Sequence, residues 1–268
     1  MSIVASVKVY DGIVIGAESM TQVFANAGGQ PQYIKSYTHA QKIFQIASLP
    51  VGVLTYGGGN IGNRSMESFA HEFSQLERLD VGNLEKTVEA ISGRLLVFLR
   101  RFYDQAFGAL QVDQRPVVGF YLGGYSPDEP LASEWEFVLP QAVAPTRVRP
   151  DAMVGASWRG VGIPFTRLFV GVDPRVDQIL AGLGVPQATI QALRQAITNQ
   201  LTSKVAFEGM PIQDAIAFCK HIIDTTISVA TFEIGAASCG GPVNIAVITR
   251  NGFEWVSKPK FTLSTAQG

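Results

Sequence analysis

Short apolar runs separated by polar or glycine-containing breaks occupy the N-terminal part of the chain, a pattern typical of β-strands. The runs are rich in Val and Ile and carry few charged residues. The segment 27–32, which contains Gly and Gln, interrupts the pattern. The pattern therefore predicts strands at 3–9, 13–17, 42–47 and 51–56.

The link between the first two predicted strands, Tyr10-Asp11-Gly12, has the composition of a hairpin turn. A three-residue turn with Gly12 in the left-handed conformation would place Glu18 opposite Val4, on the sheet face that carries Ser2. A two-residue turn would send Glu18 to the opposite face. A site that combines Ser2 with Glu18 is therefore expected to require the three-residue turn.

After residue 62 the apolar residues recur with helical spacing. Helices are predicted at 63–79 and 83–110. In the second of these, one face of the helix is apolar and comprises Leu84, Val88, Ile91, Leu95, Phe98 and Phe102.

Strands return at 116–122 and 135–139, and the proline-rich segment 140–150 predicts a loop. Further helices are expected from Pro164 onward, since Pro186 and Pro211 each suit the first turn of a helix. For the C-terminal part a hairpin is predicted, with a turn at Asn251-Gly252 and strands at 243–249 and 253–256.

Strands and helices are thus grouped along the chain rather than alternating. Grouping favours an α+β fold over a doubly wound parallel sheet. No internal repeat or low-complexity tract is present, so one domain is predicted over residues 1–268.

Composition narrows the classes of function. The 268 residues include 21 Lys and Arg and 22 Asp and Glu, and a net charge of -1 argues against a nucleic-acid partner. Charged residues make up only 16% of the chain, and no apolar run reaches the ~18 residues of a membrane span. We therefore expect no membrane partner, and we expect a homo-oligomer in which apolar surface is covered by a second subunit.

Two cysteines, Cys219 and Cys239, cannot form a disulfide framework and lack zinc-ligand spacing. The N-terminal residues do not have the pattern of a secretory signal, so a cytoplasmic location is expected. The three histidines are scattered over different elements, which argues against a Ser-His-Asp hydrolase.

The glycine-rich segment Gly57–Gly62 has the G-x-G-x-x-G spacing of a dinucleotide site and lies between a predicted strand and a predicted helix. The second parallel strand and the acidic ribose ligand of that unit are missing. A tight turn whose backbone N–H groups could hold an oxyanion is therefore favoured over nucleotide binding.

Ser2 follows Met1 directly, and removal of Met1 would leave a free α-amine on the same residue as a hydroxyl. That amine has a pKa of about 7.7–8.0, so it can act as a general base for the hydroxyl. One residue then supplies both nucleophile and base. Many proteins begin Met-Ser without catalytic meaning, so this pattern alone does not establish an enzyme.

Two charged residues at strand ends add to this interpretation. Glu18 ends an apolar run, and Lys42 begins the next apolar strand. An ammonium beside Ser2 would lower the pKa of the hydroxyl, and Glu18 would hold that ammonium in place. Two solvent-exposed strand-end charges are the other interpretation of the same spacing.

The chain resembles the proteasome β-subunit superfamily of N-terminal nucleophile hydrolases, including its bacterial ancestral type. The resemblance covers nearly the whole chain, apart from a helical insertion at about 169–203. It lies in six segments that occur in the family's order: 2–18, 42–46, 52–57, 122–124, 160–165 and 240–250.

This resemblance implies a four-layer αββα sandwich that assembles into rings or related homo-oligomers, needs no cofactor or metal, and cleaves peptide or other amide bonds. The nucleophile maps onto Ser2, the acidic residue onto Glu18, the lysine onto Lys42 and the oxyanion-hole N–H onto Gly57. Thr21 is assigned to substrate binding.

The chain departs from the family at three supporting positions, where Val161, Ala236 and Cys239 replace Ser, Asp and Ser. A non-catalytic, ring-forming subunit is therefore the competing interpretation. Retention of Met1 would favour it, because an acylated amine is no base.

Overall fold

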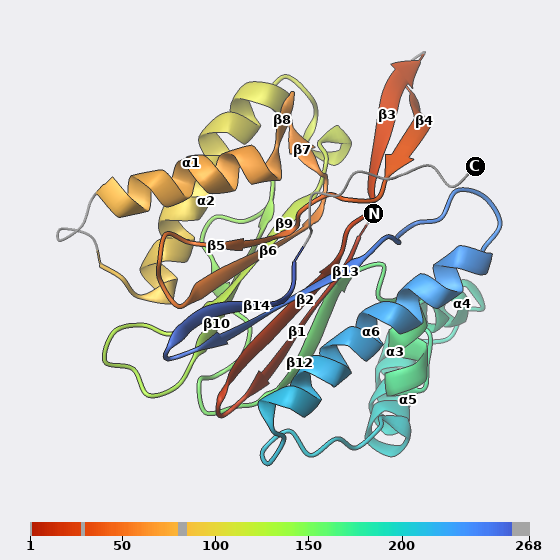
Figure 1. The fold of residues 1–268 in the computed structure, drawn as a ribbon. Helices are drawn as coiled ribbons and strands as arrows, with labels where there is room; N and C mark the ends of the chain where they lie inside the picture. Colours follow the sequence, from red (N-terminus) through yellow and green to blue (C-terminus); the bar gives the residue numbers. More distant parts are fainter. Residues whose placement is uncertain (1, 28–29, 80–84, 259–268) are drawn as a thin grey trace, which may run out of the picture.

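The computed structural model describes residues 2–27, 30–79 and 85–258. This part of the chain is a mixed α/β structure with six α-helices and several antiparallel sheets (Figure 1). The first five-stranded sheet has the order β12-β1-β2-β13-β14. Its strands are β12 (Gly155–Gly160), β1 (Ile3–Val9), β2 (Gly12–Glu18), β13 (Val243–Thr249) and β14 (Gly252–Ser257).

The second five-stranded sheet has the order β11-β10-β9-β6-β5. Its strands are β11 (Thr146–Arg147), β10 (Ser133–Leu139), β9 (Val118–Gly124), β6 (Val51–Gly57) and β5 (Ile43–Gln45). The remaining described strands form two two-stranded hairpins. One pairs β3 (Thr21–Ala27) with β4 (Gln30–Tyr37), and the other pairs β7 (Asn60–Ile61) with β8 (Arg64–Ser65).

Helices lie on the outer face of each sheet (Figure 1). Helices α1 (Met66–Leu79) and α2 (Val88–Phe107) share an apolar core with β6, β9 and β10 of the second sheet. Helices α3 (Ile163–Val170) and α6 (Ile212–Phe232) share another core with the first sheet.

A third apolar cluster joins the inner faces of the two sheets. It contains Ile13 and Ile15 from β2, Ile43 from β5, and Leu54 from β6. β1, β2 and β9 are buried at every position, so most of their residues are apolar on both faces, although Ser6 and Lys8 of β1 and Glu18 of β2 are buried with them. The long Val/Ile runs in the sequence thus reflect strands covered on both faces.

The first hairpin differs from the expectation. Its turn has two residues, Tyr10-Asp11, and Val9 pairs with Gly12. The three-residue turn is therefore wrong: Ala17, not Glu18, lies opposite Val4. Glu18 and Ser2 are nevertheless connected, because the ammonium of Lys42 forms an ion pair with Glu18 and also donates a hydrogen bond to Ser2 Oγ.

The structure also contains strands that the sequence did not predict. β11 and β12 lack the alternation of apolar and polar residues that indicates a strand. β3 and β4 pair as a hairpin, although the segment 27–32 was interpreted as a break in the strand pattern. Helix α2 begins at Val88, and the expected helical start at 83–84 lies outside the described residues.

Helices α4 (Val176–Gly182) and α5 (Gln187–Leu201) lie within 169–203, the segment expected to be a helical insertion. The assignment of all 268 residues to one domain stays a prediction. The two five-stranded sheets contain only antiparallel neighbours among the described strands, which is incompatible with a doubly wound parallel sheet.

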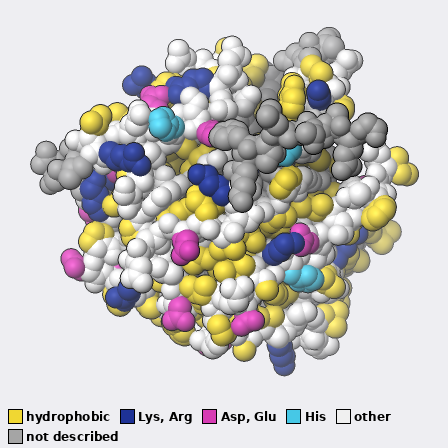
Figure 2. Space-filling view, viewed as in Figure 1, with side chains coloured by type: hydrophobic (Ala, Val, Ile, Leu, Met, Phe, Trp, Pro, Cys, Tyr) yellow, Lys and Arg dark blue, Asp and Glu magenta, His cyan; other side chains and the backbone are white. Residues whose placement is uncertain are grey.

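Helix α6 is long and apolar enough to span a membrane by length and composition, whereas no apolar run of that length was expected. Its apolar face includes Ala215, Cys219 and Ile223, which pack on the first sheet. Only 33% of the most apolar stretch of α6 is buried, and this face accounts for part of the composition. Figure 2 shows that apolar side chains also gather across the middle of the face on which β14 and α6 lie, with charged side chains scattered around them.

Candidate active site

Lys42 lies immediately before β5, where its carbonyl accepts a hydrogen bond from the Thr55 N–H of β6 at 2.9 Å. Its ammonium donates to Ser2 Oγ at 2.9 Å and to the Met20 carbonyl at 2.6 Å. It also forms an ion pair with Glu18 Oε1. The structure thus brings together Ser2, Glu18 and Lys42, three residues predicted from the sequence to form a site.

Glu18 is fully buried at the end of β2. Its Oε1 pairs with Lys42, and its Oε2 accepts hydrogen bonds from the Met20 N–H at 2.7 Å and the Gly240 N–H at 3.1 Å. A buried carboxylate is tolerated only when it is paired and hydrogen-bonded. These contacts fix the carboxylate and, through it, the position of the ammonium.

Ser2 is held through its backbone by the end of β12. Its carbonyl accepts a hydrogen bond from the Val161 N–H at 2.8 Å. Gly160 has φ of +85°, and a Cβ at this position would lie 1.7 Å from the Ser2 oxygen, so only glycine permits this approach. The side chain of Val161 therefore need not carry a polar group to hold the Ser2 backbone.

The electrostatics of the cluster are dominated by burial. Burial lowers the pKa of Lys42 from its ordinary value of 10.5, and the charge and hydrogen bond of Glu18 oppose this shift. Burial raises the pKa of Cys239 to about 11, with a further contribution from the charge of Glu18. Cys239 is therefore a neutral thiol beside the ion pair at ordinary pH.

Gly57 ends β6 with φ of +86°, and a Cβ there would lie 2.3 Å from the Val117 carbonyl oxygen. The Thr55 N–H donates to the Lys42 carbonyl, on the side of β6 that faces β5. The Gly58 N–H donates to the Val117 carbonyl at 2.9 Å. Because N–H groups of alternate strand residues point to the same edge, the Gly57 N–H is directed past the start of β5, toward the cleft.

Ser2, Lys42 and Gly57 line one cleft of about 610 Å³. Thr21 lines it as well, and its Oγ1 would lie 2.8 Å from a Cβ on Gly59. The structure thus places Thr21, the first residue of β3, beside the glycine turn. All five residues predicted for the site lie in or beside this cleft.

Sequence reasoning missed the backbone groups that complete the cluster: the Met20 carbonyl and N–H, the Gly240 N–H and the Val161 N–H. Any residue supplies such groups, so side-chain identity gives no signal for them. Ala236 lies on the surface and brings no polar side chain to the site.

The site has no features of a metal or dinucleotide centre. Among the described residues, no group of three or more His, Cys, Asp or Glu side chains could hold a metal ion. The segment Gly57–Gly62 leads from β6 into the short β7, and both neighbours of β6 are antiparallel, so the unit that binds dinucleotides is absent from this part of the chain.

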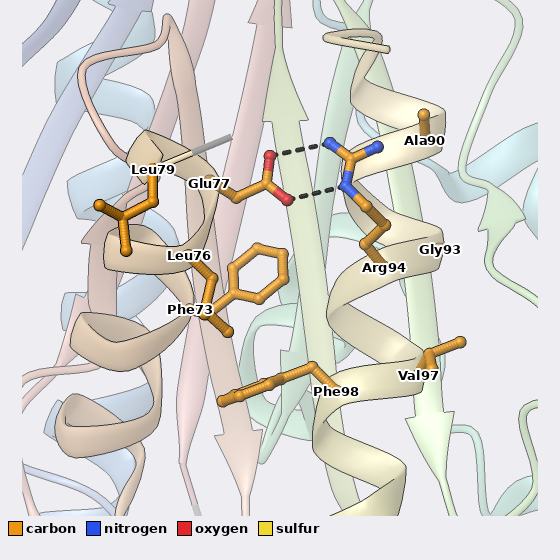
Figure 3. A pocket seen from close by; sticks show the side chains of 9 residues that line it. All are labelled: Phe73, Leu76, Glu77, Leu79, Ala90, Gly93, Arg94, Val97 and Phe98. Atoms are coloured by element: carbon orange, nitrogen blue, oxygen red, sulfur yellow. Dashed lines mark hydrogen bonds and ion pairs between the residues drawn. The ribbon is translucent and has the colours of Figure 1, made fainter. Parts of the chain in front are cut away.

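A larger cavity of about 770 Å³ lies between α1 and α2 (Figure 3). Its walls are mainly apolar, with Phe73, Leu76 and Phe98 among them. The two charged residues that line it, Glu77 and Arg94, are bonded to each other at 2.7 and 2.8 Å. It therefore offers no free nucleophile or base, and the cleft at Ser2 is the candidate site.

Comparisons with known proteins give the fold. No protein-family model and no curated protein matches the chain. Two solved structures similar to it are Anbu (ancestral beta-subunit) proteins. For that from Yersinia bercovieri, the TM-score is 0.52 and the identity 13%, over 95% of this chain and 86% of the other.

The second is described as the helical assembly of the Anbu complex from Pseudomonas aeruginosa. Its TM-score is 0.58 and its identity 16%, over 96% of this chain and 88% of the other. At these identities the likeness shows the fold alone. The chain has a proteasome-like fold.

Proposed function

We propose that the protein is an N-terminal nucleophile hydrolase that cleaves peptide or other amide bonds, with Ser2 as nucleophile after removal of Met1. The observation that carries this proposal is the hydrogen bond from Lys42 Nζ to Ser2 Oγ at 2.9 Å, within an ion pair buried with Glu18. The two sheets between outer helices also fit the four-layer αββα sandwich of that superfamily.

The proposed reaction begins when the neutral α-amine of Ser2 accepts the proton of its own hydroxyl. The oxygen then attacks the carbonyl carbon of the substrate, and the negative charge that develops on the carbonyl oxygen is stabilised by the Gly57 N–H. Lys42, kept charged by Glu18, favours the alkoxide form of Ser2.

The tetrahedral intermediate collapses when the C–N bond breaks and the α-ammonium returns its proton to the leaving amine. This step leaves an ester between Ser2 Oγ and the acyl part of the substrate. Water, deprotonated by the same α-amine, then attacks the ester and releases the acid. Each step needs only groups of this chain and water.

We infer that the substrate is a peptide or protein and that the chain acts in the cytoplasm as a homo-oligomer. Exposed apolar residues support self-association: Phe24, Tyr33, Ile34 and Tyr37 project from the β3–β4 hairpin, and Val256 lies on the edge strand β14. The Anbu complex of Pseudomonas aeruginosa is described as a helical assembly, which agrees with this inference.

A non-catalytic, ring-forming subunit is the second candidate. It is favoured by the side chains at Val161, Ala236 and Cys239, which supply neither a carboxylate nor a hydroxyl near Ser2. The two candidates differ in one property, because only the hydrolase needs a free amine at Ser2.

A β-lactone probe tests the proposal. Intact mass is expected to show loss of Met1 and one acyl adduct, which Ser2→Ala abolishes. Ser65→Ala, which removes another hydroxyl of the same cleft, is expected to keep the adduct. An unreactive protein of full translated mass, or an adduct that persists in Ser2→Ala, would refute the hydrolase.

A further inference from the structure

Three polar residues form a network beside the cleft that the proposed reaction does not use. The hydroxyl of Tyr56, on β6, donates a hydrogen bond to Glu136 Oε1, on β10. Arg159 of β12 binds the same carboxylate with two hydrogen bonds, from Nε at 2.6 Å and from a terminal nitrogen at 2.9 Å. The network therefore links the second sheet to the first.

One end of this network touches the nucleophile strand. Arg159 pairs with Val4 of β1, and the next two residues hold Ser2: Gly160 packs against its carbonyl oxygen, and Val161 donates to that oxygen. Fixing Arg159 therefore fixes the backbone of Ser2.

The other end touches the oxyanion donor. The peptide bond between Tyr56 and Gly57 carries the Gly57 N–H, and both residues line the cleft. The ring of Tyr56 lies across Gly119 of β9, where a Cβ would approach Tyr56 Cζ to 2.1 Å. With its ring lying over Gly119 and its hydroxyl bound to Glu136, Tyr56 has little freedom to tilt this peptide.

We propose that Tyr56, Glu136 and Arg159 are positioning residues that fix the separation between the Ser2 hydroxyl and the Gly57 N–H. The two groups belong to different sheets, and apolar packing between sheets resists sliding less specifically than a bidentate ion pair does. The proposal rests on the hydrolase function proposed above. A small error in this separation slows acyl transfer without weakening substrate binding.

Tyr56→Phe is the sharpest test, because Glu136 keeps both hydrogen bonds to Arg159 and no buried charge is left unpaired. Acylation by the β-lactone is measured over a range of probe concentrations. The maximum rate constant is expected to fall about tenfold, with the half-saturating concentration unchanged within about twofold. Arg159→Lys, which keeps the charge but not the two-point contact, is also expected to lower the maximum rate constant.

Tyr121→Phe is the matched control. The Tyr121 hydroxyl donates to Glu134 at 2.7 Å, two residues along β10, and Glu134 also accepts from Ser6 of the other sheet at 3.3 Å. This network does not line the cleft. The control is expected to lower the melting temperature and to keep the wild-type maximum rate constant.

A wild-type rate constant in Tyr56→Phe, or an equal loss in Tyr121→Phe, would overturn the positioning role while leaving the hydrolase intact. A wild-type protein that is not acylated at Ser2 would overturn both. The two failures are therefore distinguishable.

Discussion

Lys42 Nζ lies 2.9 Å from Ser2 Oγ, although 40 residues separate them in the chain. Both side chains are almost completely buried, and the ammonium is shared with a carboxylate that is itself fully buried. Removing a charged pair from water opposes folding unless geometry and hydrogen bonds compensate. Because the buried Lys42–Glu18 ion pair also contacts the Ser2 hydroxyl in a cleft, a catalytic role accounts for it better than a contribution to the stability of the fold.

Removing the Lys42 charge separates these two roles. Lys42→Met leaves the Glu18 carboxylate buried without a counter-charge, so the free energy of unfolding is expected to fall by about 3–5 kcal/mol. The double variant Lys42→Met with Glu18→Gln is expected to recover most of this loss and to stay unreactive toward the β-lactone. Denaturant unfolding and intact mass measure the two properties. A reactive double variant would show that Lys42 has no part in acylation.

The pH dependence of acylation is expected to be bell-shaped. The rate rises as the α-amine of Ser2 loses its proton, at about pH 7.7–8.0 for an unperturbed amine. It falls again when Lys42 loses its charge, and burial moves this limb to a pH below 10.5. Lys42→Arg is expected to remove the alkaline limb. A rate that rises steadily to pH 10.5 in the wild type would mean that Lys42 acts as the neutral base instead.

Gly57→Ala tests the oxyanion donor. Alanine at φ of +86° costs about 1–2 kcal/mol, and its Cβ would also meet the Val117 carbonyl at 2.3 Å. Acylation is expected to slow by about 100-fold or more as the N–H is displaced. Gly62→Ala has a similar backbone strain, at φ of +59°, but its nearest neighbour lies at 3.4 Å. Equal slowing in both variants would argue against a role for the Gly57 N–H.

The two cysteines are expected to resist alkylation in the folded protein. Burial raises the pKa of Cys239 to about 11 and that of Cys219 above its ordinary value, so neither is a thiolate at pH 8. Iodoacetamide, followed by mass analysis, should modify both only after denaturation. Rapid modification of Cys239 in the folded protein would contradict its assignment as a buried neutral thiol.

Much of the fold follows from local pattern. The strands β1, β2, β6 and β13 are rich in Val, Ile and Leu and were predictable from that pattern. Helix α2 was predictable from its continuous apolar face. β12 was not, because Gly155–Gly160 forms a strand only by pairing with β1, about 150 residues earlier in the chain.

The site shows the same division. Residue type and strand position made Ser2, Glu18 and Lys42 candidates, and the resemblance to the proteasome β-subunit superfamily selected them over solvent-exposed charges, yet the expected turn was wrong. Tyr56, Glu136 and Arg159 lie 80 and 23 residues apart in sequence, on three strands. No local periodicity indicates that such residues meet, since their contact depends on how two sheets stack.

The central claim is that Ser2 presents a hydroxyl and a free amine on one residue. An epoxyketone, which has two electrophilic carbons, can close a ring only by reacting with both groups. After reaction and digestion, tandem mass spectrometry is expected to find the adduct on a peptide that begins at Ser2, joined through Oγ and the α-nitrogen. An unmodified peptide that still begins with Met1, or an adduct on any other residue, would contradict the account.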